Sequence, residues 1–158
     1  MPQRAKDSHL RSNELKTVHS VNISVFVHAT EEEDKVLNVL KRFLSEDANV
    51  QKEHATGHFR NPIEVLTVKI TKHRDIAKFL DLIKQNLPKD DIHKLLNDLN
   101  CYVNDEGVLF IRINKQEAAR NSLKLGKKDP ILVRVKIAAY PARKEKALEV
   151  ARGLLSDG

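Results

Sequence analysis

The chain has 158 residues, a formal net charge of +6, a single cysteine and an ordinary apolar content of 41%. This length is enough for one domain whose core needs neither disulfides nor metal. No apolar run approaches the roughly 20 residues of a membrane helix, and no apolar stretch of a secretory signal follows the first charged residues. The lone Cys101 forms no internal disulfide, so we expect a cytoplasmic protein with this cysteine buried in a strand.

The positive charge is concentrated in the last third of the chain. Between Arg112 and Lys146 there are eleven Lys and Arg residues and only three acidic residues. A local excess of this size is typical of proteins that bind a polyanion such as nucleic acid. The alternative is a charged surface that only aids solubility.

The first predicted elements follow a polar basic arm, residues 1–16, which has no periodicity. Residues 17–29 alternate between apolar and polar, which predicts a strand with one buried face. Residues 30–44 have apolar residues at helical spacing, and Thr30 and Glu33 have the spacing of a capping box, so a helix is predicted to begin there. The strand's predicted buried residues are Val21, Ile23, Val25 and Val27.

The middle of the chain alternates between strand and helix patterns. Residues 48–61 match neither pattern and are predicted to be a loop. Residues 62–70 are predicted to form a second strand that begins at a proline, and residues 71–87 an amphipathic helix. Pro88 opens a further short helix, because proline is favoured in the first turn.

The last third is predicted to contain most of the remaining sheet. Residues 101–113 have the form of a hairpin, in which Asn-Asp-Glu-Gly supplies the turn. Residues 114–129 are predicted to be a short helix or loop, and residues 130–140 a long strand. Pro141 begins a terminal helix whose inner residues are Ala147, Val150, Ala151, Leu154 and Leu155.

This order predicts an α+β fold, a two-layer sandwich with a mainly antiparallel sheet of about five strands and helices on one face. Alternating strands favour one covered face, since a sheet covered on both sides would have continuously apolar strands. Residues 17–158 are predicted to form one α+β domain after the flexible basic arm of residues 1–16.

Two segments resemble each other, "GHFRNPIEVLTVKI" at residues 57–70 and "GKKDPILVRVKI" at residues 126–137. Each has a glycine, basic residues, Asn or Asp before proline, and an alternating run that ends Val-Lys-Ile. Because alternate side chains of a strand point to opposite faces, part of each strand must point away from the helices. The outward cations and rings are predicted to be Lys69, Arg112, Arg134, Lys136, Phe26 and Phe110.

Cations interleaved with aromatic rings favour single-stranded RNA as the ligand. Cations neutralise phosphates, and ring faces stack on unpaired bases. The turns before the two similar strands extend this surface, and their glycines would let the backbone approach a phosphate. The candidate residues in these turns are His58, Arg60, Lys127 and Lys128. The alternative is a face whose charged side chains only interact with water, with Phe26 and Phe110 packed under a loop, the arm or a second subunit.

The sequence contains no motif for catalysis or for a cofactor. It has no CxxC, HExxH or Gly-x-Ser-x-Gly, and no glycine-rich phosphate loop. His54 and His58 are four residues apart, but the glycine between them disfavours a helix that presents both to zinc. We therefore expect no enzyme, no metal and no cofactor, with a metal-dependent nuclease as a remote alternative.

The segments "VHSVNISVFVHATEEEDKVLNVL", "GHFRNPI" and "DPILVRVKI" resemble a family of small archaeal proteins described as predicted exosome subunits or RNA-binding proteins. The resemblance covers residues 17–155. It implies a cytoplasmic RNA-binding role and a double-stranded-RNA-binding-like fold, related to a ribosomal protein that contacts 5S ribosomal RNA. His58, Arg60 and Asn61 match the family's loop and become RNA-binding candidates. The resemblance supplies no catalytic residue.

Two hypotheses follow from the sequence. The first is a non-catalytic RNA-binding protein, an accessory factor in RNA processing or degradation whose partners are RNA and components of the exosome or ribosome. The second is an assembly module that uses the open sheet face for a homodimer or a protein partner. Neither hypothesis involves a membrane.

Overall fold

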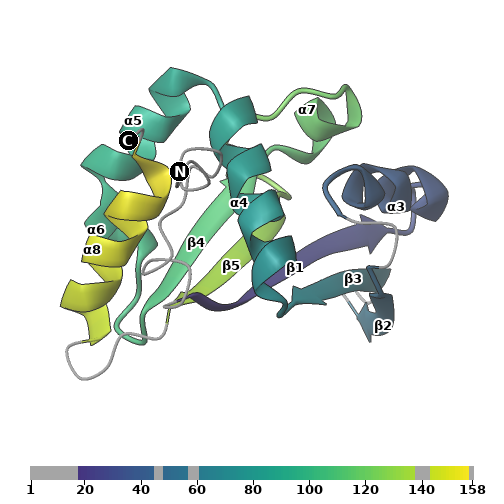
Figure 1. Cartoon of the computed structure of the whole chain (residues 1–158). Helices are drawn as coiled ribbons and strands as arrows, with labels where there is room; N and C mark the ends of the chain where they lie inside the picture. The colour runs from purple at the N-terminus through teal and green to yellow at the C-terminus, as the bar shows by residue number, and fades with distance from the viewer. Residues whose placement is uncertain (1–17, 45–47, 57–60, 138–142, 157–158) are drawn as a thin grey trace.

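A five-stranded antiparallel sheet forms the centre of the protein (Figure 1). The computed structural model describes residues 18–44, 48–56, 61–137 and 143–156. The spatial order of the strands is β2-β3-β1-β5-β4, and every neighbouring pair is antiparallel. The strands are β1 (Val18–His28), β2 (Val50–Thr56), β3 (Pro62–Ile70), β4 (Val108–Ile113) and β5 (Ile131–Ile137).

Helices cover one side of this sheet, which confirms the predicted two-layer α+β fold. In Figure 1, α4 crosses in front of the strands, and α5, α6 and α8 gather over the β4 side. None of the described helices is both long enough and apolar enough to cross a membrane. The helices are α3 (Glu33–Arg42), α4 (His73–Asn86), α5 (Lys89–Asn97), α6 (Leu99–Tyr102), α7 (Lys115–Ala119) and α8 (Arg143–Leu155).

The core lies between the sheet and the helices, and it follows the predicted alternation. In β1 the four residues from Val21 to Val27 at odd positions are at most 5% exposed. The predicted inner residues of α8, from Ala147 to Leu155, are likewise all buried. Each fully buried aliphatic side chain contributes roughly 1.5–3 kcal/mol, so the alternation fixes which side of each strand faces the helices.

β2 is a strand that the sequence analysis predicted to be a loop. It is the edge strand of the sheet, and all but its first residue are exposed. A strand that buries so little has no apolar alternation to recognise. It pairs with β3 from Val50↔Val68 to Thr56↔Pro62, so residues 57–61 connect the two strands of a hairpin.

The predicted strand around Cys101 is also wrong. Residues 99–102 form the short helix α6, and Cys101 is exposed. Only a single bridge, Val103↔Leu109, remains of the predicted hairpin. The predicted turn is present, because Gly107 has a positive φ of 83° and its N–H donates to the carbonyl of Asn104. The number of strands is therefore right, although β2 replaces the predicted strand at residues 101–103.

The helix predicted to begin at Thr30 begins at Glu33 instead. Its N-cap residue is Glu32, and no side chain caps the first turn. The predicted capping box is therefore wrong. The nearby Glu31 carboxylate accepts hydrogen bonds from the backbone N–H of His28 and from Lys115, so this segment is held by contacts outside the helix.

The two similar segments of the sequence lie on either side of β1. β3 and β5 both run antiparallel to β1, so Ile63 of β3 lies opposite His28, and Leu132 of β5 lies opposite Ser24. Their registers differ, since Asn22 lies opposite Lys69 of β3 and opposite Arg134 of β5. This arrangement places cations from both segments around the same residue of β1, Asn22.

Candidate nucleic-acid interface

The candidate site is the side of the sheet away from the helices, which we call the open face. One line of paired residues crosses it, from Lys69 through Asn22 and Arg134 to Phe110. Neighbouring strands are about 4.8 Å apart, so these four side chains span three strand spacings. We call this line the cross-strand row. It combines two exposed cations, a half-buried amide and a half-buried ring.

Two further cations flank the cross-strand row. Arg112 is two residues beyond Phe110 along β4 and lies opposite Leu132, and Lys136 is two residues beyond Arg134 along β5 and lies opposite Val108. Lys69, Arg112, Arg134 and Lys136 are all exposed. None of the four makes an ion pair with an acidic residue in the part of the chain that the structure describes. Their charges are therefore available to an anionic ligand.

The two predicted rings have different surroundings. Phe110 is half-buried, and the guanidinium carbon of Arg112 lies 5.7 Å from its ring centroid, within cation–π range. Phe26 is 49% exposed and meets the ring of His28 edge-on at 6.5 Å. Phe26 is displaced from the row by four residues along β1, roughly 13 Å. The two rings therefore do not form one stacking platform.

The described residues of the two predicted basic turns lie toward the end of the sheet where β1 ends. Lys127 and Lys128 are exposed in the segment before β5, and Asn61 is exposed just before β3. His58 and Arg60, predicted from the same loop as Asn61, lie outside the described residues. Asn61 is therefore at the opposite end of β3 from Lys69, roughly 26 Å away along the strand.

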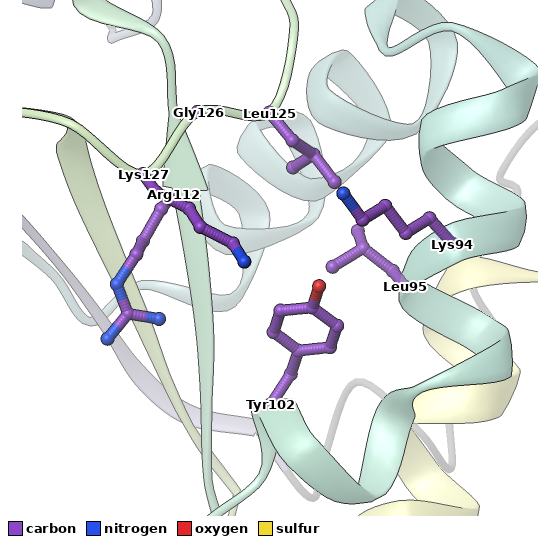
Figure 2. A pocket seen from close by; sticks show the side chains of 7 residues that line it. All are labelled: Lys94, Leu95, Tyr102, Arg112, Leu125, Gly126 and Lys127. Carbon is purple, nitrogen blue, oxygen red and sulfur yellow. The ribbon is translucent and has the colours of Figure 1, made fainter.

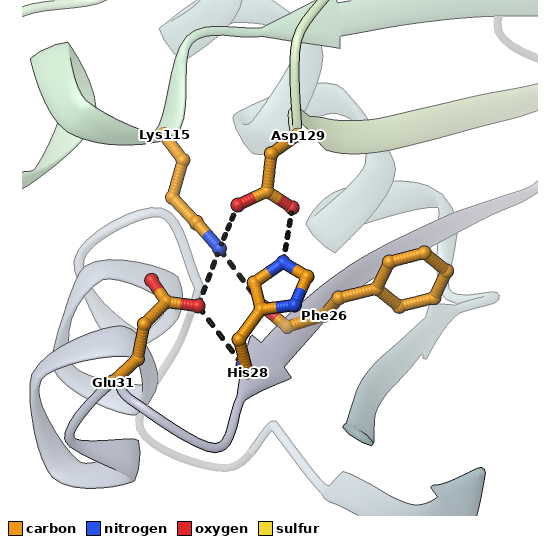
Figure 3. Close-up of polar contacts among 5 residues, drawn as sticks. All are labelled: Phe26, His28, Glu31, Lys115 and Asp129. Atoms are coloured by element: carbon orange, nitrogen blue, oxygen red, sulfur yellow. Dashed lines mark hydrogen bonds and ion pairs between the residues drawn. The ribbon is translucent and has the colours of Figure 1, made fainter. Parts of the chain in front are cut away.

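A buried lysine anchors this end of the sheet, as Figure 3 shows. Lys115, at the start of α7, is 5% exposed. Its ammonium donates to the carbonyl of Phe26 at 2.9 Å and pairs with Glu31 at 3.0 Å and with Asp129 at 2.7 Å. Asp129 also contacts His28 Nε2 at 3.0 Å. The three donors of the ammonium are thus satisfied by three acceptors, which makes a buried charge tolerable.

This network explains the Asp-Pro pair that precedes β5. Asp129 has a positive φ of 46°, a conformation that aspartate tolerates better than most residues. Burial acts to raise the pKa of Asp129, but hydrogen bonds from Lys115 and His28 outweigh it and lower that pKa below its usual value. Asp129 is therefore held ionised, and its carboxylate fixes where β5 begins.

The same network bears on metal binding. His28, Glu31 and Asp129 bring their ligand atoms within 4.8 Å of one another, which is close enough to share an ion. However, the Lys115 ammonium already lies between the two carboxylates and supplies the positive charge that they require. A second cation there would meet like-charge repulsion, so the cluster is best explained as a structural ion-pair network.

Gly126 has a structural role that differs from the predicted approach to phosphate. A Cβ atom at this position would lie 2.9 Å from Cβ and 3.0 Å from Cα of Asn114. The Gly126 N–H donates to the carbonyl of Arg112, which extends the pairing at the β4 edge. Gly57, the glycine of the other turn, lies outside the described residues.

An antiparallel sheet with one open face that carries exposed cations is a surface on which some α+β proteins bind nucleic acid. A family model described as RNA binding matches residues 20–137. The chain therefore belongs to this RNA-binding family. The matched region spans all five strands and the helices α3 to α7.

Relatives and solved structures support the assignment. The chain is 34% identical over 140 residues to a Pyrococcus abyssi protein named as an RNA-binding protein, covering 85% of this chain and 91% of that one. A crystal structure from Archaeglobus fulgidus has 33% identity and a TM-score of 0.80, over 87% of this chain and 99% of that one. A Methanothermobacter thermautotrophicus structure has 28% identity and a TM-score of 0.75, over 88% and 98%. The chain thus shares its family with an archaeal protein named as RNA-binding and its fold with two archaeal proteins of known structure.

Proposed function

We propose that this protein is a non-catalytic RNA-binding protein that holds single-stranded or structured RNA on its open face. The observation that carries the proposal is the cross-strand row, where Lys69 and Arg134 flank Asn22 and Phe110 stands at the end. Exposed cations attract the phosphates, while the amide and the ring offer a hydrogen bond and a stacking surface to a base. Membership in an RNA-binding family supports the same ligand.

The cation–π pair at the end of the row favours unpaired bases. Arg112 lies over the Phe110 ring, and both a guanidinium plane and a phenyl ring can stack on a base. Stacking needs bases that are free of a duplex and contributes roughly 1–3 kcal/mol per base. Loops, bulges and single-stranded ends of RNA are therefore the proposed targets. The proposed role is that of an accessory factor in RNA processing or degradation, with components of the exosome or ribosome as partners.

The proposal is tested by reversing two charges on the open face. Arg134→Glu together with Lys136→Glu should abolish micromolar or tighter binding to a single-stranded RNA in a filter-binding assay, because both side chains are exposed and lack an acidic partner among the described residues. The matched control is Lys89→Glu with Lys146→Glu, which makes the same change in charge on the helical layer. Unchanged affinity in the first variant would remove the open face as the RNA-binding surface.

Assembly through the open face is the second candidate, and Phe26 is the observation that favours it. At 49% exposure it is the large apolar side chain that the described part of the protein leaves most open to water. Sedimentation of the pure protein separates the candidates. A tight dimer that Phe26→Ala converts to a monomer, with RNA affinity unchanged, would favour assembly over RNA binding at this position.

A further inference from the structure

A cavity of about 420 Å³ lies beside the open face, between α5, α6 and the edge of β4. Leu95, Leu125 and Tyr102 form apolar parts of its wall, and Lys94, Lys127 and Arg112 contribute cations. In Figure 2 the ammonium groups of Lys94 and Lys127 and the hydroxyl of Tyr102 point into the space between them, whereas the Arg112 guanidinium points away. Arg112 also belongs to the open face, so the cavity adjoins that face at β4.

The charged side chains that line this cavity all have one sign. No acidic side chain is among the lining residues in the described part of the chain. The nearby carboxylate of Asp91 instead accepts a hydrogen bond from the backbone N–H of Leu125 at 3.0 Å. This bond ties the segment before β5 to α5 and so holds the two sides of the cavity together. The opening is therefore preformed and positive.

We propose that this cavity takes one unpaired nucleotide of the RNA that lies on the open face, an inference that rests on the proposed function. The base contacts Leu95, Leu125 and the Tyr102 ring, and the phosphate is held by Lys94 and Lys127. The volume lies within the range of small-molecule sites and greatly exceeds the roughly 30 Å³ of a water molecule. A bare phosphate would leave the apolar wall without a partner, and an apolar ligand would leave two ammonium groups without one.

Tyrosine fluorescence tests the proposal directly. The chain has no tryptophan and only two tyrosines, Tyr102 and Tyr140. In the Tyr140→Phe variant, Tyr102 is the sole emitter and lines the cavity. A single-stranded RNA oligonucleotide and AMP should each change its emission saturably, with AMP binding more weakly than RNA and adenosine more weakly than AMP. The Tyr102→Phe variant, whose emission comes from Tyr140 alone, is the control for emission changes that do not involve Tyr102.

Paired lysine variants test the phosphate contact. Lys127→Gln and Lys94→Gln should each weaken AMP and RNA binding roughly tenfold, since each removes a charge-assisted hydrogen bond. Lys124→Gln is the matched control for Lys127→Gln, because Lys124 is exposed on the same segment and does not line the cavity. Equal losses of AMP and RNA affinity in Lys127→Gln and Lys124→Gln would show a general effect of charge and would overturn the proposed pocket.

The outcomes separate this proposal from the proposed function. RNA binding with saturable changes in Tyr102 emission supports the cavity, provided that AMP binds more tightly than adenosine. RNA binding that leaves Tyr102 emission unchanged and is indifferent to Lys94→Gln overturns the cavity while the open face keeps its role. Failure of the unaltered protein to bind any RNA at low salt overturns the proposed function itself, and the cavity as an RNA site with it.

Discussion

At the scale of single residues, Lys115 shows how a charge is kept in the interior. It is the only charged residue of the described chain that is buried, and its three hydrogen-bond acceptors come from β1, the turn before α3 and the turn before β5. Removing one partner of such a group leaves an uncompensated charge, which costs more than the pair contributes. The network therefore locks three segments that are distant in the sequence.

Asp129→Asn should destabilise the protein at neutral pH by roughly 2 kcal/mol, because Lys115 and His28 lose an ionised partner. The native pKa of Asp129 lies below its ordinary value of 3.8. A carboxyl with a lowered pKa contributes stability that is complete above its unfolded value and is lost as pH falls through the native value. Urea unfolding of the parent and of Asp129→Asn should therefore show a difference in the free energy of unfolding that persists down to about pH 3.8 and shrinks below it.

The control for this prediction is Asp105→Asn. Asp105 is 96% exposed and lies 3.8 Å from Lys144, so its ion pair is screened by water. This variant should change the free energy of unfolding little at any pH. A loss of stability in Asp105→Asn as large as that in Asp129→Asn would contradict the special role of the buried network.

At the scale of elements, the edge of β4 depends on a close approach. Gly126 and Asn114 are paired so tightly that a methyl group has no space between them. Gly126→Ala should lower the free energy of unfolding by roughly 1–3 kcal/mol, the usual cost of overpacking, measured by urea titration. Gly153→Ala, inside α8, should instead be neutral or stabilising, because alanine is the better helix former. A Gly126→Ala protein as stable as the parent would refute the close packing.

The elements also differ in how well the sequence predicts them. β1, α4 and α8 bury a complete apolar stripe, so their periodicity is visible and their predictions are confirmed. β2 buries almost nothing, and it becomes a strand because β3 offers it an unpaired edge. Its hydrogen bonds are made to β3, a separate segment of the chain, so no pattern within residues 50–56 predicts them.

At the scale of the whole molecule, the salt dependence of RNA affinity should show how many cations of the open face bind phosphates. If its four cations, Lys69, Arg112, Arg134 and Lys136, each neutralise one phosphate, log K for single-stranded RNA should fall with log salt at a slope of about −3. Arg134→Gln with Lys136→Gln should roughly halve the slope, as measured by filter binding at several salt concentrations. Lys89→Gln with Lys146→Gln should leave it unchanged. A slope near zero in the parent would contradict phosphate binding by this face.

The candidate site was predictable in part because strand parity is local. Alternation alone correctly put Lys69, Arg134 and Phe110 on the side away from the core. Register is not local, so the order in which these residues cross the sheet, and the distance of Phe26 from Phe110, appeared only in the structure. Their role in binding RNA stays a prediction for the charge-reversal experiment.

The amino-acid sequence by itself determined the α+β class, the buried faces of the strongly periodic elements and the excess of positive charge, because each depends on residue type and spacing within one segment. Only the tertiary structure decided that β1 lies between the two similar strands, that Lys115 unites three segments, and that Lys94, Tyr102 and Lys127 enclose one cavity. These features depend on contacts between residues far apart in the chain. Packing of the whole core, rather than any local preference, selects them.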